Sequence, residues 1–141
     1  MYHTIILAGI LGRDPEMRYT PNGQAVTNLN VAVDDSYTDS SGERIKRTIW
    51  IRVSVWGRQA EMCNQYLQKG KRVLVQGRLQ TDPNTSGPRV FTRQDGTTGA
   101  SFEVTAQTVR FLSPRTEDDT SFPTTGMESD VQSEADEEIP F

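Results

Sequence analysis

The clearest alternation of apolar and polar residues in this chain lies between Arg47 and Arg58. Every second residue from Ile49 to Val55 is apolar and β-branched, and successive side chains of a strand point to opposite faces of a sheet. The alternation therefore predicts a strand whose apolar face joins a core. The opposite face of this strand carries Thr48, Trp50, Arg52, Ser54 and Trp56.

The tryptophans on the polar face have two interpretations. Large exposed aromatic side chains usually mark a binding surface, and aromatic faces interleaved with arginine suit stacked bases and a phosphate chain. Alternatively, a second layer or a partner subunit covers this face. This strand alone supports the two interpretations about equally.

Four further segments have the pattern of strands. Val26–Asp34 and Arg72–Gln80 alternate, and Thr4–Leu11 and Phe102–Leu112 are rich in apolar and β-branched residues. Gly9, inside the first of them, indicates a bulge or a close approach of another backbone. Together with the central strand, these segments predict an all-β domain.

One segment, Arg58–Lys69, has the spacing of a helix, and Gly70 supplies a stop signal after it. The residues of this helix expected in the core are Ala60, Cys63, Tyr66 and Leu67. The polar stretch Asp35–Lys46 predicts a loop or a flexible hairpin. Thr81–Ala100 is rich in Gly, Pro and Thr and predicts a long hairpin loop, which at this length is usually functional or disordered.

The charge of the chain changes sign at Ser113. Residues 1–112 contain 14 basic and 10 acidic residues, whereas residues 113–141 contain one basic and nine acidic residues. We expect a mildly basic nucleic-acid-binding domain over residues 1–112 and a disordered linker over residues 113–135. The last six residues have apolar side chains after an acidic run and no core to join, which predicts a protein-interaction tip: Asp136, Glu137, Glu138, Ile139, Pro140 and Phe141.

Residue types that carry catalysis are scarce. Cys63 is the only cysteine and His3 the only histidine, which excludes an internal disulfide, a Cys-based zinc site and Ser-His-Asp chemistry. The only candidate carboxylate pairs lie in predicted turns without a catalytic partner: Asp34 with Asp35, and Asp14 with Glu16. We expect no enzyme activity, no metal and no cofactor. Without a signal peptide or a membrane span, the sequence predicts a cytoplasmic location.

Five strands with one helix between the third and the fourth match the order of an OB-fold, a five-stranded Greek-key barrel. Such barrels bind oligonucleotides or oligosaccharides on one face and in the surrounding loops. We therefore predict the all-β class and an OB-fold, followed by a disordered acidic C-terminal tail.

Several short motifs occur in order along the chain. They are Ile6–Gly9 with Leu11–Tyr19 and Pro21–Gly23, Trp50–Val53 with Trp56–Glu61, Tyr66–Gly70, Val75–Leu79 and the terminal Asp136–Phe141. Each is weak alone, but the whole set resembles the bacterial single-stranded DNA-binding proteins. The resemblance covers residues 2–112 and the last six residues.

The resemblance implies a homotetramer around which single-stranded DNA wraps during replication, recombination and repair, with partner proteins recruited by the tip. It places the protein in the bacterial cytoplasm, associated with the nucleoid. It assigns base stacking to Trp50, Trp56, Tyr37 and Phe91. It assigns phosphate contacts to Arg18, Arg52, Arg58 and Lys69, with Arg89 and Arg93 as further contacts in the long loop.

The chain also departs from the family pattern, and simpler interpretations remain open. Thr81–Arg89 is several residues longer than in well-known members, and Ile51 stands where histidine is common at the subunit interface. Tyr37 could cap the barrel, Phe91 could anchor its loop, and Arg13 and Arg110 are expected to be ordinary surface charges. An RNA-binding or translation-associated OB module is the alternative function, although it gives no reason for the acidic Ile-Pro-Phe end.

Overall fold

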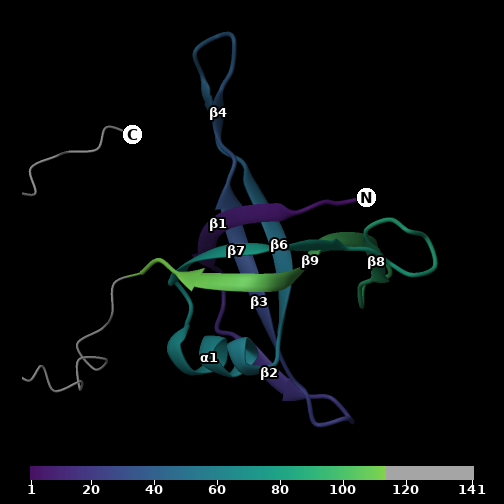
Figure 1. The fold of residues 1–141 in the computed structure, drawn as a ribbon. Helices are drawn as coiled ribbons and strands as arrows, with labels where there is room; N and C mark the ends of the chain where they lie inside the picture. The colour runs from purple at the N-terminus through teal and green to yellow at the C-terminus, as the bar shows by residue number, and fades with distance from the viewer. Residues whose placement is uncertain (114–141) are drawn as a thin grey trace, which may run out of the picture.

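The alternating segments of the sequence form five long strands that close into a barrel (Figure 1). The computed structural model describes residues 1–113. The barrel strands are β1 (Ile5–Leu11), β3 (Ala25–Asp34), β6 (Thr48–Trp56), β7 (Arg72–Gln80) and β9 (Thr98–Phe111). Their hydrogen-bonded order is β1-β7-β9-β6-β3, and β1 closes the barrel by pairing with β3 at Ile10–Ala32 and Leu11–Val31. Strands β6 and β9 are parallel, and the other pairs are antiparallel. The predicted OB-fold, with one helix between the third and fourth barrel strands, is confirmed.

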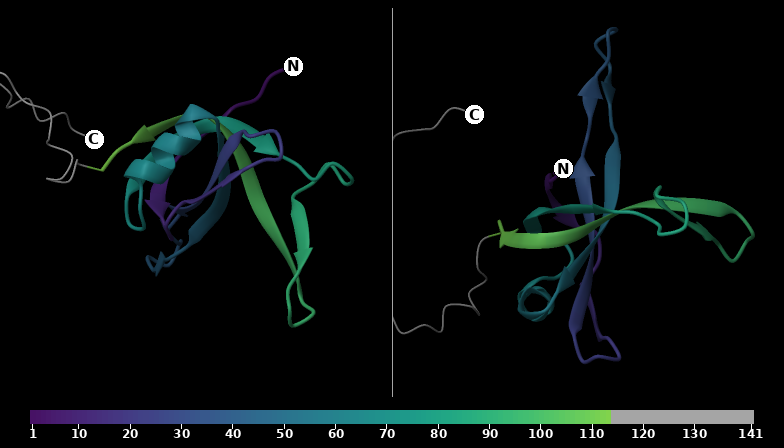
Figure 2. Two further views of the ribbon diagram at one scale, coloured as in Figure 1. Left: turned by 90° about the horizontal axis from the view of Figure 1, so that it is seen from below. Right: turned by 45° about the vertical axis from the view of Figure 1, so that its right-hand side comes forward.

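Four short strands form hairpins that project from the barrel (Figures 1 and 2). Strand β2 (Glu16–Tyr19) pairs with β3, and β4 (Tyr37–Thr38) pairs with β5 (Arg44–Ile45). Strand β8 (Arg89–Thr92) pairs with the first residues of β9. The β4–β5 hairpin extends to the top of Figure 1, and the β8–β9 hairpin extends to its right.

The long connection after β7 therefore contains a hairpin of its own, and the last barrel strand starts earlier than the sequence predicts. Strand β9 begins at Thr98 instead of Phe102, because its first residues pair with β8 beyond the barrel. Leu79 keeps the alternate spacing of Val73 and Val75 but is 46% exposed. It follows the register shift at Gln76–Gly77, on the part of β7 that leads into the hairpin.

The core lies between the barrel strands and the single helix, α1 (Arg58–Tyr66). Alternate strand residues fill it, among them Leu7, Leu11, Leu29, Val31, Val53, Val55, Val73, Val75 and Val104. Ala60, Cys63 and Leu67 close one end, and the buried Thr27 hydroxyl of β3 donates a hydrogen bond of 2.7 Å to the Ala60 carbonyl. No helix in residues 1–113 is long and apolar enough to cross a membrane.

The helix ends at Tyr66, three residues before the predicted end. Leu67 adopts an extended conformation (φ −100°, ψ 150°), and its side chain is buried. The core contact of Leu67 therefore ends the helix before the Gly70 stop signal. Tyr66 was expected in the core, but it is 47% exposed and packs beside Phe111, with 6.5 Å between the ring centres.

Two glycines allow the barrel strands to approach one another closely. A Cβ on Gly9 would lie 2.4 Å from the Ala32 carbonyl oxygen, and a Cβ on Gly77 would lie 2.2 Å from the Thr105 carbonyl oxygen. Real Cβ atoms do not come so close to a backbone oxygen, so both positions require glycine. The close backbone approach predicted at Gly9 is confirmed.

Candidate nucleic-acid interface

The outer face of β6 forms the centre of the candidate site. In the β3–β6 register, Trp50 lies opposite Ala32, Arg52 opposite Asn30, and Trp56 opposite Val26. Trp50 is 57% exposed and Trp56 is 39% exposed, whereas Val53 and Val55 on the other face are fully buried. The alternation predicted for this strand is confirmed, and within residues 1–113 no second layer covers the tryptophans.

The two indoles mark the two ends of this face. They are six residues apart on one strand, which places their backbone positions about 20 Å apart. Beside Trp56, the register continues across Val26 to Arg18 on β2. Trp50 lines the groove described next.

A groove of about 600 Å³ lies at the Trp50 end of the face. Its lining residues come from the segment after β1 and from β2, β3, β6, β8 and β9: Arg13, Glu16, Asn28, Asn30, Trp50, Ile51, Arg52, Arg89, Phe91 and Ser101. Four of the residues singled out in the sequence therefore meet in one groove, namely Trp50, Arg52, Arg89 and Phe91. The groove combines two aromatic rings with three arginines.

Arg13, expected to be an ordinary surface charge, lines the groove. With its amide oxygen turned toward Arg13, Asn30 accepts hydrogen bonds from Arg13 Nε at 2.6 Å and Nη2 at 3.0 Å. The sequence does place Asn28 and Asn30 on the outer face beside β6, because they alternate with buried apolar residues of β3. Nothing in the sequence around Arg13 shows which strand it meets.

An ion pair ties the hairpin arginine to the barrel. Arg89 Nη1 lies 3.4 Å from Glu103 Oε1, and the Ser101 hydroxyl donates to the same oxygen at 3.3 Å. The side chain of Glu103 is only 11% exposed, whereas that of Arg89 is 53% exposed. Since Glu103 also stands beside Arg52 in the β6–β9 register, one carboxylate neighbours two of the groove arginines.

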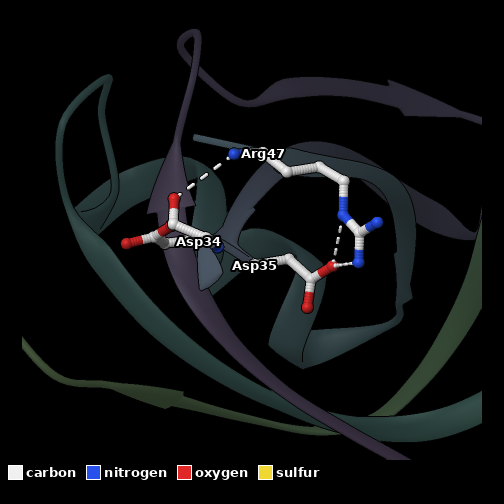
Figure 3. A network of polar contacts seen from close by, with 4 residues as sticks. Asp34, Asp35 and Arg47 are labelled. Atoms are coloured by element: carbon white, nitrogen blue, oxygen red, sulfur yellow. Dashed lines mark hydrogen bonds and ion pairs between the residues drawn. The ribbon is translucent and has the colours of Figure 1, made fainter. Parts of the chain in front are cut away.

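Tyr37 lies outside the groove, on the β4–β5 hairpin. The Arg47 guanidinium stands over its ring, with Cζ 5.3 Å from the ring centre. Arg47 also forms an ion pair with Asp35, to which its Nε donates at 2.7 Å (Figure 3). Next to this pair, hydrogen bonds from Ser36 favour the charged form of Asp34 and lower the pKa of that carboxyl group. Tyr37 is 48% exposed.

The other predicted contacts do not line the groove. Arg18 and Arg58 lie toward the Trp56 end, and the backbone N–H of Lys69 donates to Asp14 Oδ1 at 2.8 Å. The Arg93 guanidinium stands over the ring of Phe91, with Cζ 5.3 Å from its centre. The tip residues 136–141 and the linker residues 113–135, apart from Ser113, lie outside the described part of the chain.

Two further features of the described residues concern metal and thiol chemistry. No three His, Cys, Asp or Glu side chains in residues 1–113 are grouped as metal ligands would be. Cys63 is buried in the core, and burial raises the pKa of its thiol to about 11.

Residues 2–112 match the family described as Single-strand binding protein family. The single-stranded DNA-binding protein of Neisseria meningitidis serogroup A is 38% identical over 113 residues, which cover 80% of this chain and 61% of that relative. The single-stranded DNA-binding protein of Halalkalibacterium halodurans is 43% identical over 117 residues, covering 82% and 63% of the two chains. The chain thus spans about three fifths of the length of these curated relatives.

The fold is also similar to a solved structure. A crystal structure of a deletion mutant of the single-stranded DNA binding protein from Thermus aquaticus superposes with a TM-score of 0.61 at 35% sequence identity. The match covers 79% of this chain and 51% of that one. The groove, with its aromatic rings and arginines, lies within the matched family region.

Proposed function

This chain belongs to the single-strand binding protein family, and from that premise we propose that it binds single-stranded DNA without sequence preference during replication, recombination and repair. One observation carries the proposal: Trp50 and Phe91 line the same groove as Arg13, Arg52 and Arg89. Bases stack on aromatic faces whatever their identity, and arginines neutralise the phosphates. The role is binding and not catalysis, and the bacterial origin of the relatives supports action in the bacterial cytoplasm.

Each part of the outer face has its own task in this proposal. Trp50 and Phe91 stack bases in the groove, while Arg52 and Arg89 contact the phosphates beside them. Trp56 stacks a base at the far end of β6, where Arg18 and Arg58 contact the chain that continues past it. Tyr37 on the β4–β5 hairpin and Lys69 after α1 extend the contact beyond the barrel face. The separation of the two indoles means that different nucleotides occupy the two ends.

Tryptophan fluorescence tests the proposal directly, because the chain has only two tryptophans. The variant Trp56→Phe reports on Trp50 alone, and Trp50→Phe reports on Trp56 alone. Titration with oligo-dT should quench both signals, and affinity should fall as salt rises because bound cations are released. Duplex DNA and oligo-U serve as matched ligands. An absence of quenching and binding with oligo-dT would contradict the proposal, and tighter binding of oligo-U would favour the RNA-binding alternative.

We propose a homotetramer as the working assembly. Its support is an apolar patch on the outer face of β1 and β7, where Ile6 is 63% exposed and Ile10 is 41% exposed. Leu74 lies on the same face, opposite Ala8 in the register. Exposed apolar patches on a sheet are typical of subunit contacts. Sedimentation equilibrium should give four times the chain mass, and a monomer at micromolar concentration would contradict this assembly.

We also propose that residues 113–135 link the domain to a protein-binding tip, Asp136–Phe141. The support is chemical: an Ile-Pro-Phe end behind three carboxylates suits an apolar pocket rimmed by basic residues. Deleting Phe141 should leave oligo-dT affinity unchanged and abolish capture of replication and repair proteins. A synthetic peptide of the last six residues should compete for that capture. Undiminished capture by the shortened chain would contradict the assignment.

A further inference from the structure

Phe91 reaches the groove from the β8–β9 hairpin, which extends away from the barrel (Figure 2). The residue directly opposite Phe91 in this hairpin is Gly99. The neighbouring residues Phe91–Thr98 are all exposed, but Gly99 is buried. Since the hairpin has no core beneath it, neighbouring side chains must cover this glycine.

Phe91 and Arg93 are the side chains that cover it. A Cβ on Gly99 would lie 2.7 Å from Phe91 Cζ and 2.7 Å from Arg93 Nη2, closer than real Cβ contacts. The φ of Gly99 is not in the left-handed region, so the backbone would accept another residue. Glycine at this position therefore lets the ring and the guanidinium lie directly on the backbone, and an added Cβ would displace both.

Arg93 has three contacts that hold it against this surface. Its Cζ stands 5.3 Å from the centre of the Phe91 ring, its Nη1 donates to the Thr98 carbonyl at 3.2 Å, and its Nη2 lies over Gly99. Arg93, directly after β8, does not line the groove, whereas Arg89 at the start of β8 does. Its guanidinium is occupied by the hairpin and not directed at the groove.

We propose that Gly99 and Arg93 are positioning residues that fix the Phe91 ring at the groove wall for stacking on a base of single-stranded DNA. This inference rests on the proposed function and reassigns Arg93, which the family resemblance suggested as a phosphate contact. An unsupported ring would have to be ordered when DNA binds, whereas a ring held in place avoids that cost. Loss of the support should weaken binding by about 2- to 10-fold, the range expected for immobilising one side chain.

The experiment compares oligo-dT affinity across a series of salt concentrations in the full chain. Gly99→Ala should weaken binding by about 2- to 10-fold, and it should add nothing further when Phe91 is already replaced by Ala. Gly87→Ala is the matched control, because that glycine is in the same connection, its φ is also not left-handed, and the nearest atom to its added Cβ is 3.6 Å away. Equal affinities of the Gly99→Ala and Gly87→Ala variants would overturn the proposal.

The salt dependence separates positioning from a phosphate contact for Arg93. Arg93→Gln should weaken binding while the slope of log K against log salt stays unchanged. A phosphate contact would instead reduce the magnitude of the slope by about 0.7, and that result would overturn the positioning role.

A readout without DNA keeps this test separate from the proposed function. The reporter chain carries Phe91→Trp together with Trp50→Phe and Trp56→Phe, so its only tryptophan is at position 91. Acrylamide quenching of the tryptophan fluorescence should increase when Gly99→Ala or Arg93→Gln is added, because the ring loses its support. Unchanged quenching would overturn the inference. Failure of the wild-type chain to bind oligo-dT would refute the proposed function, while the quenching result would still decide the positioning role.

Discussion

Replacing Glu103 by Gln tests whether the groove is partly neutralised by its own carboxylate. Glu103 is nearly buried, pairs with Arg89 at 3.4 Å and stands beside Arg52 in the register. Glutamine has nearly the same shape and can still accept the hydrogen bond from Ser101. The substitution removes the charge that occupies Arg89 and little else, so Arg89 becomes fully available to a phosphate. We expect the Glu103→Gln variant to bind single-stranded DNA more tightly than the wild type.

The size of the effect follows from counterion release. One additional neutralised phosphate increases the magnitude of the slope of log K against log salt by about 0.7 for a single strand. If the wild type and the variant bind equally at 1 M salt, this increment gives the variant about a 3-fold gain in affinity at 0.2 M salt and about an 8-fold gain at 0.05 M. Arg89 is half exposed, so losing the ion pair should cost at most about 1 kcal/mol of folding stability.

The assay is fluorescence titration with oligo-dT over this salt range, with thermal melting as a folding control. Glu16→Gln is the matched variant, because Glu16 also lines the groove but forms no ion pair within residues 1–113. It should leave the slope unchanged. Weaker binding by the Glu103→Gln variant would refute the reasoning, since it would mean that Glu103 holds Arg89 where DNA needs it. An unchanged slope would show that Glu103 does not compete with a phosphate for Arg89.

Three further outcomes follow from the structure. Gly77→Ala should reduce the free energy of unfolding by about 1–3 kcal/mol through overpacking against a backbone oxygen, while Gly87→Ala is nearly neutral; equal denaturation midpoints would contradict this. Cys63, with its raised pKa of about 11, should have roughly one thiolate in a thousand at pH 8, so an aromatic disulfide reagent should label it slowly until the chain unfolds, and fast labelling of the folded protein would be inconsistent with burial. Trp50→Ala and Trp56→Ala should each cost about 1–3 kcal/mol of binding free energy and should be additive, since the sites are about 20 Å apart; a coupling above about 0.5 kcal/mol would show that one nucleotide contacts both.

The barrel could be predicted because each of its strands separates a buried face from an exposed one. On β6 the inward-facing isoleucines and valines alternate with Trp50, Arg52, Ser54 and Trp56, and a similar alternation marks β3 and β7. Strands β4, β5 and β8 have no such division, because none of their residues belongs to the core cluster or packs against it. All four residues of β8 are exposed, and a segment without a buried face shows no hydrophobic period. Leu79 keeps the alternate spacing of β7 but is exposed, because it lies beyond the register shift at Gln76–Gly77, where the strand has left the core.

The candidate site could likewise be predicted only in part. Trp50 and Arg52 could be placed together from the sequence, because they share one face of one strand. The convergence of Arg13, Arg89 and Phe91 on that face depends on two connections of different length, the one after β1 and the one after β7. A local pattern holds no information on where such connections bring their residues. The ion pair between Arg89 and Glu103 could not be predicted from the sequence for the same reason.

Tyr37 and Phe91, on two of the projecting hairpins, are held in a similar way. A ring on a hairpin has no apolar layer beneath it, yet the stacking role proposed for it requires one fixed orientation. In both hairpins an arginine stands over one face of the ring at 5.3 Å, Arg47 over Tyr37 and Arg93 over Phe91. Each guanidinium is fixed by a second contact, with Asp35 in one case and with a backbone carbonyl in the other. A cation on one face leaves the other face for a base, so the binding surface can extend beyond the barrel without a larger core.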